Sequence, residues 1–87
     1  MLKIETTHGN TERTLKLEGT LIGLWVDELR RSCDVARLDG QRVTLDLTDV
    51  GFVDSAGLDL LRTLEDAGVS LANASRFVVE QLKAAAR

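Results

Sequence analysis

The chain of 87 residues has no proline, no tyrosine, one cysteine and one histidine, and its aromatic residues are Trp25, Phe52 and Phe77. A single cysteine, Cys33, excludes an internal disulfide bond, and one cysteine with one histidine cannot supply the ligands of a usual zinc site. So few aromatic side chains offer no platform for stacked bases. The core must therefore be aliphatic, and Cys33, which lies in an apolar helical pattern, is expected to be a small buried hydrophobic residue.

An excess of positive charge is also missing. The formal net charge is −3, and residues 46–87 carry seven acidic against four basic side chains. Nucleic acids and anionic membrane surfaces both attract concentrated basic patches, so neither is an expected partner. No hydrophobic run suits a signal peptide or a membrane span, and the glycines never fall in the spacing of a phosphate-binding loop. These absences predict a cytoplasmic protein without a cofactor.

The first part of the chain has the pattern of a β-hairpin. Residues 2–5 and residues 14–18 each alternate apolar and polar side chains. The polar segment between them contains the turn-forming pair Gly9-Asn10, which is typical of a hairpin. We expect Gly19 to end the second strand.

The rest of the chain alternates helical and strand patterns. An apolar period of about four from residue 21 predicts a helix that ends between residues 38 and 40, and alternation over residues 43–47 predicts a strand. The leucines from residue 58 predict a second helix with Gly68 as its C-cap, followed by a short strand over residues 69–72. A third helix is capped by Asn73 or Ser75, runs into the alanines at 84–86, and has an apolar side formed by Phe77, Val78, Val79 and Leu82.

The predicted order is β-β-α-β-α-β-α, and residues 1–87 are expected to form a single α/β domain. Strands separated by helices of this length pair in parallel through right-handed crossovers, and the helices pack on the sheet. No repeat, linker or low-complexity segment divides the chain. The small sheet is therefore expected to be mixed but mainly parallel.

Ser55 is the most prominent candidate for a functional side chain, because it stands where the strand and loop at residues 43–54 lead into the second helix. Its hydroxyl can cap that helix by accepting a hydrogen bond from a free backbone N–H. The same position suits a phosphate, since a helix N-terminus presents unpaired N–H groups and a positive dipole end. The small residues Ala56 and Gly57 leave room for a kinase to approach. The two interpretations are compatible, and both stay open here.

Four carboxylates surround this serine in the sequence: Asp46, Asp49, Asp54 and Asp59. Asp46 and Asp54 come from the strand end and the loop, so we expect them to converge at the carboxyl edge of the sheet. Paired carboxylates can perform acid–base chemistry or hold Mg²⁺. A solvated acidic rim would instead repel a phosphate added to Ser55, so that phosphorylation would change the surface sharply.

A small hydrolase with Ser55 as nucleophile is a further alternative. Its base would have to be His8, which lies in the predicted hairpin turn, and the two side chains would have to meet across the sheet. We expect His8 to be a solvent-exposed turn residue instead, and the protein not to be an enzyme.

The segment Asp46–Leu58 resembles the signature of STAS domains, a family named for sulfate transporters and anti-sigma-factor antagonists. The resemblance lies in an Asp-hydrophobic-Thr triplet at Asp46 and in the later run Val53-Asp54-Ser55-Ala56-Gly57-Leu58. Residues 69–75 also resemble the family's strand followed by an Asn-x-Ser helix start, and the element order agrees over nearly the whole chain. The resemblance implies a small sheet with helices on one side and a phosphorylatable serine at a helix N-terminus.

In anti-sigma-factor antagonists that serine is phosphorylated by the anti-sigma kinase, and the unphosphorylated form binds the kinase and frees a sigma factor. The resemblance therefore implies that Ser55 is the phosphoacceptor, and that the partner-binding residues are Asp46, Asp54, Ser55, Ala56, Gly57, Leu58 and Asp59. The chain departs from the family at Ile22, where an acidic residue usually follows Gly-x-Leu. Its second helix is also several residues shorter than is typical.

The leading interpretation is thus a regulatory protein-binding module, an anti-sigma-factor antagonist switched at Ser55. The alternative is a STAS accessory subunit of an ABC transporter that moves lipid, in which the same helix docks on an ATPase. Ile22 favours a partner other than the usual kinase. An exposed first or fourth strand would permit weak dimers, so the chain is expected to be a monomer or a weak dimer.

Overall fold

The secondary structure follows the predicted order β-β-α-β-α-β-α. The structure is a computed structural model that describes residues 1–85. Its elements are β1 (Leu2–His8), β2 (Glu12–Leu21), α1 (Leu24–Leu38), β3 (Arg42–Val53), α2 (Ser55–Asp66), β4 (Ser70–Ala72) and α3 (Arg76–Ala85).

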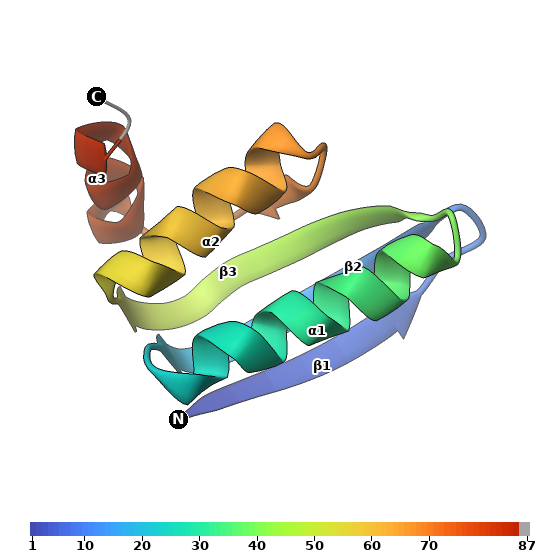
Figure 1. The fold of residues 1–87 in the computed structure, drawn as a ribbon, viewed down its shortest axis with the longest axis horizontal. Helices are drawn as coiled ribbons and strands as arrows, with labels where there is room; N and C mark the ends of the chain where they lie inside the picture. The colour runs from blue at the N-terminus through green and yellow to red at the C-terminus, as the bar shows by residue number, and fades with distance from the viewer. Residues whose placement is uncertain (86–87) are drawn as a thin grey trace.

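The strands form one mixed sheet in the order β1-β2-β3-β4. β1 and β2 are an antiparallel hairpin, whereas β2 pairs with β3 and β3 with β4 in parallel. The hairpin turn therefore lies at one end of the molecule, where His8 pairs with Arg13, and Leu21 lies beside Val53 at the other end. This second end also holds the starts of α1 and α2 (Figure 1).

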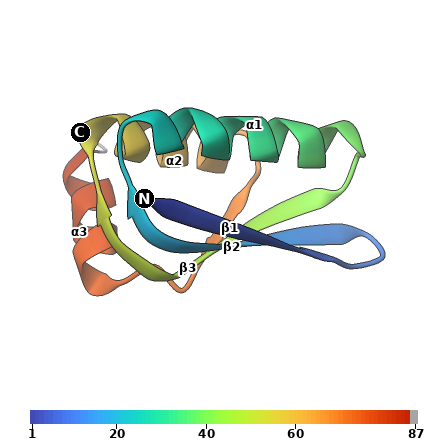
Figure 2. The same ribbon diagram turned by 90° about the horizontal axis from the view of Figure 1, so that it is seen from below.

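The helices α1 and α2 lie side by side over one face of the sheet, and α3 stands at one end, beside the end of β3 (Figure 2). Side chains on the covered face are aliphatic and buried, because alternate strand residues point to it. Cys33 of α1 is fully buried among them, and this burial raises the pKa of its thiol to about 11. Its prediction as a small core residue is confirmed. The largest fully buried side chains are Leu15, Leu17, Leu21, Leu29, Leu45, Leu47 and Leu61.

The second strand does not end at Gly19, so this prediction was wrong. Gly19 has φ 109, in the region that favours glycine, and lies where the register between β2 and β3 shifts. This irregularity bends the strand and lets it continue to Leu21, which is fully buried. The helical pattern starting at residue 21 therefore begins as strand, and α1 itself starts at Leu24.

The start of α3 is capped by Ser75, whose Oγ accepts a hydrogen bond from the Val78 N–H at 3.2 Å. Val78 is fully buried, but Phe77 is 52% exposed, so its predicted place on the buried side was wrong. The reason is the position of α3 at the end of the sheet, where only a narrow stripe of the helix meets the core. Of the predicted alanine run, Ala86 lies outside the described residues.

The end of α2 is one residue earlier than predicted. Ala67 is the C-cap, and Gly68 follows in the left-handed region with φ 102. The Val69 N–H then returns to the Leu64 carbonyl at 2.9 Å, which satisfies one of the free carbonyl groups at the helix end. None of the helices within residues 1–85 is long and apolar enough to cross a membrane.

Candidate functional site

The junction between β3 and α2 is held by Asp54. Its N–H donates to the Leu21 carbonyl at 3.1 Å, and its Oδ1 accepts a hydrogen bond from the Gly57 N–H at 2.8 Å. Asp54 is thus the N-cap of α2, with φ −83 and ψ −179, and Ser55 is the first residue inside the helix. The prediction that Ser55 caps the helix was wrong. Aspartate caps as well as serine does, and β3 extends to Val53, which leaves the extended cap conformation to Asp54.

The second carboxylate oxygen of Asp54 reaches a different element. Oδ2 accepts a hydrogen bond at 3.0 Å from the N–H of Gly23, the residue that precedes α1. Gly23 has φ 56 and no side chain with which to cap α1. The N–H groups of Gly23 and Gly57, in that order of importance, hold the pKa of Asp54 below its ordinary value. One ionised carboxylate therefore ties the starts of α1 and α2 together.

Gly57 lets the first turn of α2 pack directly on the end of β2. A Cβ at this position would lie 2.7 Å from the Leu21 carbonyl oxygen and 2.7 Å from Cγ1 of Val53. Neither atom can be avoided by rotating a flexible side chain, so a larger residue would push the helix off the strand. Gly57 is buried and thus serves the packing of the helix start; it offers no surface to a partner.

Ser55 and Ala56 are exposed at this helix start, and exposed Asp59 follows one turn later. Within residues 1–85 the Ser55 hydroxyl has no hydrogen-bond partner. The Gly57 and Leu58 N–H groups are bonded to Asp54, so the N–H groups of Ser55 and Ala56 are the ones left at the start of α2. Leu58 is half-buried and packs against the core. The site thus presents an unengaged hydroxyl at the positive end of a helix.

Asp46 lies elsewhere in the molecule. It is in the middle of β3, beside Ala72 of β4, and its Oδ1 accepts hydrogen bonds from the Thr48 N–H at 3.0 Å and from Asn73 Nδ2 at 3.3 Å. The pKa of Asp46 is lowered by the Thr48 hydroxyl first, then by the Thr48 N–H and Asn73. The expected convergence with Asp54 was wrong, because β3 continues far beyond the end of β4. At about 3.3 Å per residue the strand separates the two carboxylates by roughly 25 Å.

The acidic rim around Ser55 is smaller than predicted. Asp49 pairs with Lys16 of the neighbouring strand, with 3.6 Å between Oδ2 and Nζ, and does not turn to the helix start. This leaves Asp54 and Asp59 as the carboxylates close to Ser55 along the chain. In the part of the chain that the structure describes, no three of the histidine, cysteine and acidic side chains gather as they would around a metal ion.

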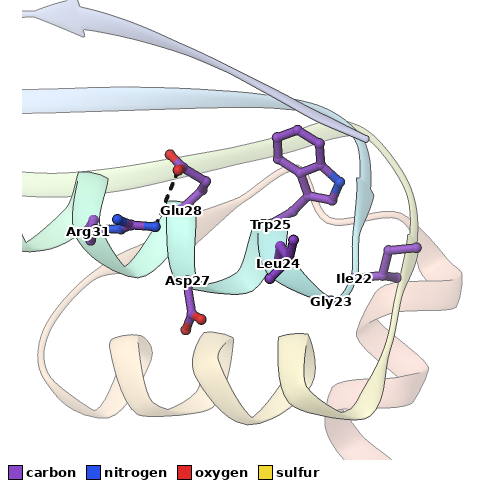
Figure 3. A pocket seen from close by; sticks show the side chains of 7 residues that line it. All are labelled: Ile22, Gly23, Leu24, Trp25, Asp27, Glu28 and Arg31. Atoms are coloured by element: carbon purple, nitrogen blue, oxygen red, sulfur yellow. Dashed lines mark hydrogen bonds and ion pairs between the residues drawn. The ribbon is translucent and has the colours of Figure 1, made fainter.

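A surface groove of about 520 Å³ follows the first turns of α1 and begins at Gly23, next to Asp54. Within it, Leu24 is 83% exposed, whereas Trp25 is half-buried against the core. Figure 3 shows Trp25 and Glu28 on one side of α1 and Asp27 on the other. Sequence reasoning missed this groove, although Leu24 lies outside the predicted apolar stripe of α1 and was the signal for it. The full lining is Ile22, Gly23, Leu24, Trp25, Asp27, Glu28 and Arg31.

A pair of exposed aromatic rings lies on the same end of the molecule. Phe52 at the end of β3 is 45% exposed and Phe77 of α3 is 52% exposed, and their rings stack with centroids 6.3 Å apart. The Gln81 side chain of α3 also donates to the Val53 carbonyl at 3.4 Å. The start of α2 is therefore flanked by apolar surface, of which the sequence pattern had placed only Phe77 on a buried side.

His8 and Ser55 lie at opposite ends of the sheet. His8 pairs with Arg13 beside the hairpin turn, and Arg13 in turn pairs with Val43, whereas Ser55 follows Val53. The length of β3, roughly 30 Å at the usual rise per residue, separates them. The two side chains cannot form a nucleophile and base pair, which removes the hydrolase alternative.

Known proteins share the fold described above. The sequence pattern of the family described as "STAS domain" matches residues 2–85. The structure is similar to that of the anti-sigma factor antagonist SpoIIAA in its unphosphorylated form, with a TM-score of 0.69, 23% identity, and 95% of this chain and 82% of that chain covered. It is also similar to an uncharacterised DUF3478-family protein with a SpoIIAA-like fold from Shewanella loihica PV-4, with a TM-score of 0.59, 13% identity, and 97% and 75% covered.

At these identities the two structures show a shared fold and no more. No curated protein matches the chain in sequence. The match to the family covers nearly all of the chain, and it includes the β3–α2 junction built around Asp54 and Ser55. This chain belongs to the STAS domain family.

Proposed function

We propose that this chain is a cytoplasmic regulatory module that docks a partner protein through the end that carries Ser55, and that phosphorylation of Ser55 ends the docking. Membership of the STAS family and the SpoIIAA-like fold favour an anti-sigma factor with serine kinase activity as the partner. The observation that carries the proposal is the exposed Ser55 hydroxyl, which is free of intramolecular hydrogen bonds within residues 1–85 because Asp54 caps the helix. A serine in this position can be modified without removing a bond that holds the fold.

A phosphate on Ser55 would change the surface more than the fold. It adds a charge of about −1.5 to −2 at neutral pH. The N–H groups of Ser55 and Ala56 and the positive end of α2 would stabilise its oxygens. Asp54 and Asp59 already bring negative charge to the same spot, so a partner surface that fits the free form would be repelled by the modified form.

The docking surface combines this charged centre with an apolar margin. Ser55, Ala56 and Asp59 would touch the partner, and exposed Leu24 and Phe52 would supply the apolar area from which most binding energy comes. Asp54, Gly57 and Leu58 would act by holding the helix start in place. Asp46, in the middle of β3, would contribute through the fold and not through contact.

Phosphorylation in vitro tests the phosphoacceptor. The chain is incubated with ATP and purified anti-sigma kinases from the organism that encodes it, and phosphate is mapped by mass spectrometry. We expect phosphate on Ser55 and none on the Ser55→Ala variant, with Ser32, Ser70 and Ser75 as internal comparisons. An unmodified Ser55, under conditions in which the kinase phosphorylates its control substrate, would contradict the proposal.

Binding to the same kinase, measured by calorimetry, tests the docking surface. Ser55→Ala should bind like the unmodified chain, and Ser55→Asp should lose on the order of 100-fold in affinity through charge repulsion. Thr63→Asp is the matched control, since it places the same charge on an exposed residue two turns along α2. Equal losses of affinity for the two aspartate variants would show that binding depends on the net charge of the chain and not on contacts with the Ser55 end.

A second partner class is favoured by the residues before α1. Half-buried Ile22 and exposed Leu24 make this margin apolar at a position where the family usually has an acid. An ATPase of a lipid-transporting ABC transporter is the alternative partner. Co-purification separates the two: recovery of such an ATPase without an anti-sigma factor would replace the partner, and Ser55→Asp would then show whether the same surface is used.

A further inference from the structure

β1 is an edge strand whose outer side has no partner within residues 1–85. On its inner side, the Met1 carbonyl accepts a hydrogen bond from the Thr20 N–H at 2.9 Å, and the Gly9 N–H donates to the Glu12 carbonyl at 2.8 Å. Bonded pairs recur at every second residue of an antiparallel ladder, and the register between β1 and β2 is regular. Odd-numbered residues therefore turn their backbone groups toward β2. The backbone groups that point outward belong to Leu2, Ile4, Thr6 and His8.

The side chains of β1 differ between its two faces. Leu2 and Ile4 lie on the face with the helices, and Ile4 stays half-buried because α1 packs over β2 and β3. Lys3 and Glu5 lie on the opposite face and form an exposed ion pair, with 3.2 Å between Nζ and Oε1. A charge on an edge strand usually discourages pairing with another strand. Two opposite charges on alternate residues have a different effect, because they make the strand complementary to itself.

We propose that two copies of this chain pair antiparallel along β1, with Ile4 of one copy opposite Ile4 of the other. In this register Lys3 lies opposite Glu5 of the second copy, and Glu5 opposite its Lys3. The outward backbone groups of Leu2 meet those of Thr6 of the second copy, and each such pair exchanges two N–H···O bonds. The Lys3–Glu5 pairs fall at the non-hydrogen-bonded positions, where opposing side chains are closest.

Charge disfavours the two nearest registers. A slip in one direction places Lys3 opposite Lys3, and a slip in the other places Glu5 opposite Glu5. Like charges that face each other directly across two strands destabilise the pairing. The outward backbone groups and the charges of β1 therefore agree on the register centred on Ile4.

The paired strands would join the two sheets into one. Because β2 lies between β1 and β3, both Ser55 ends stay accessible. The dimer thus carries two docking surfaces, one on each copy, and its formation does not depend on what those surfaces bind.

Sedimentation velocity over a range of concentrations tests the pairing. We expect the mass to rise toward twice the 9.5 kDa of one chain. Lys3→Glu places Glu opposite Glu5, and Glu5→Lys places Lys opposite Lys3, so each variant alone should weaken dimerisation at least about tenfold. An equimolar mixture of the two variants restores opposite charges at both positions and should dimerise. Glu80→Lys makes the same charge change as Glu5→Lys, but at an exposed residue of α3. It is the control and should leave the dimer intact.

Hydrogen exchange then identifies the surface. The amides of Ile4 and Thr6 should exchange at least about tenfold more slowly in the dimer than in the Lys3→Glu monomer. A single-chain mass up to about 1 mM would overturn the proposal, as would single-charge variants that dimerise like the original chain. A dimer without protection of these two amides would place the contact on another surface and would also overturn it.

Discussion

The middle and the end of β3 each carry an aspartate with a lowered pKa, but the two carboxylates do different things. In the middle, Asp46 bonds Thr48 two residues along and Asn73 from the loop after β4, so it holds an irregular strand and one loop. At the end, Asp54 bonds Gly57 and Gly23, and so joins the starts of two helices. Where a strand ends beside two helix starts, one carboxylate can accept hydrogen bonds from a free N–H group at each of them. The next side chain is then not needed as a cap. That side chain is Ser55.

The largest expected effect on stability comes from adding a side chain at Gly57, where the first turn of α2 packs closely on Leu21 and Val53. Gly57→Ala gains about 1 kcal/mol of helix propensity, but its Cβ would meet the Leu21 carbonyl and Val53, and overpacking of this kind costs about 1–3 kcal/mol. Since a backbone carbonyl cannot rotate away, we expect a cost near the upper end of this range, and hence a net loss of about 2 kcal/mol in the free energy of unfolding in urea. Gly51→Ala, with no atom within 4 Å of its Cβ, is the control and should change stability by less than about 0.5 kcal/mol. Equal effects would show that the helix start is free to shift.

The pH dependence of stability should be alike for the two aspartates. Both have a folded-state pKa below the ordinary value, so their contribution is present above the unfolded pKa of about 3.9 and is lost as the pH falls below it. Asp46→Asn and Asp54→Asn should each lower the melting temperature between about pH 5 and 7, where the ionised carboxylate contributes, and should flatten its fall in the acidic range.

Amide exchange at neutral pH tells the same two variants apart. Asp54→Asn should speed exchange at the Gly23 and Gly57 amides, which donate hydrogen bonds to the carboxylate, and leave exchange at the Thr48 amide unchanged. Asp46→Asn should do the reverse. A variant that speeds exchange in both regions would show that they are coupled and that the comparison between them fails.

The smallest effect is expected at Ser55 itself. Ser55→Ala removes a hydroxyl that bonds nothing within residues 1–85, so stability should stay within about 0.5 kcal/mol of the original. Ser75→Ala removes the hydroxyl that caps α3 and should cost about 1 kcal/mol. Thermal and urea unfolding of the two variants measure the difference. A loss at Ser55 as large as that at Ser75 would mean that Ser55 also holds the fold.

Much of the fold could be predicted because its signals are local. The apolar stripe of α1 and the alternation in β3 identified both elements, and the order of strands and helices with the Asp46–Leu58 signature indicated the family. The candidate site was found for the same reason: Ser55 follows a strand and opens a helix. Its role as a phosphoacceptor stays a prediction.

The errors occurred where an element meets a distant part of the chain. β2 passes through Gly19 because β3 continues beside it, and Phe77 is exposed because α3 stands at the end of the sheet. Neither partner is near in sequence, so neither fact is visible in the local pattern.

The sequence by itself determined the elements, their order and the presence of a serine where β3 leads into α2, since periodicity and turn residues act over a few neighbouring positions. Only the tertiary structure decided which residue caps α2. Pairing with β2 extends β3 to Val53, and the Gly23 N–H, brought near from another element, gives Asp54 a second bond. The cap therefore falls on Asp54, and the Ser55 hydroxyl is left exposed.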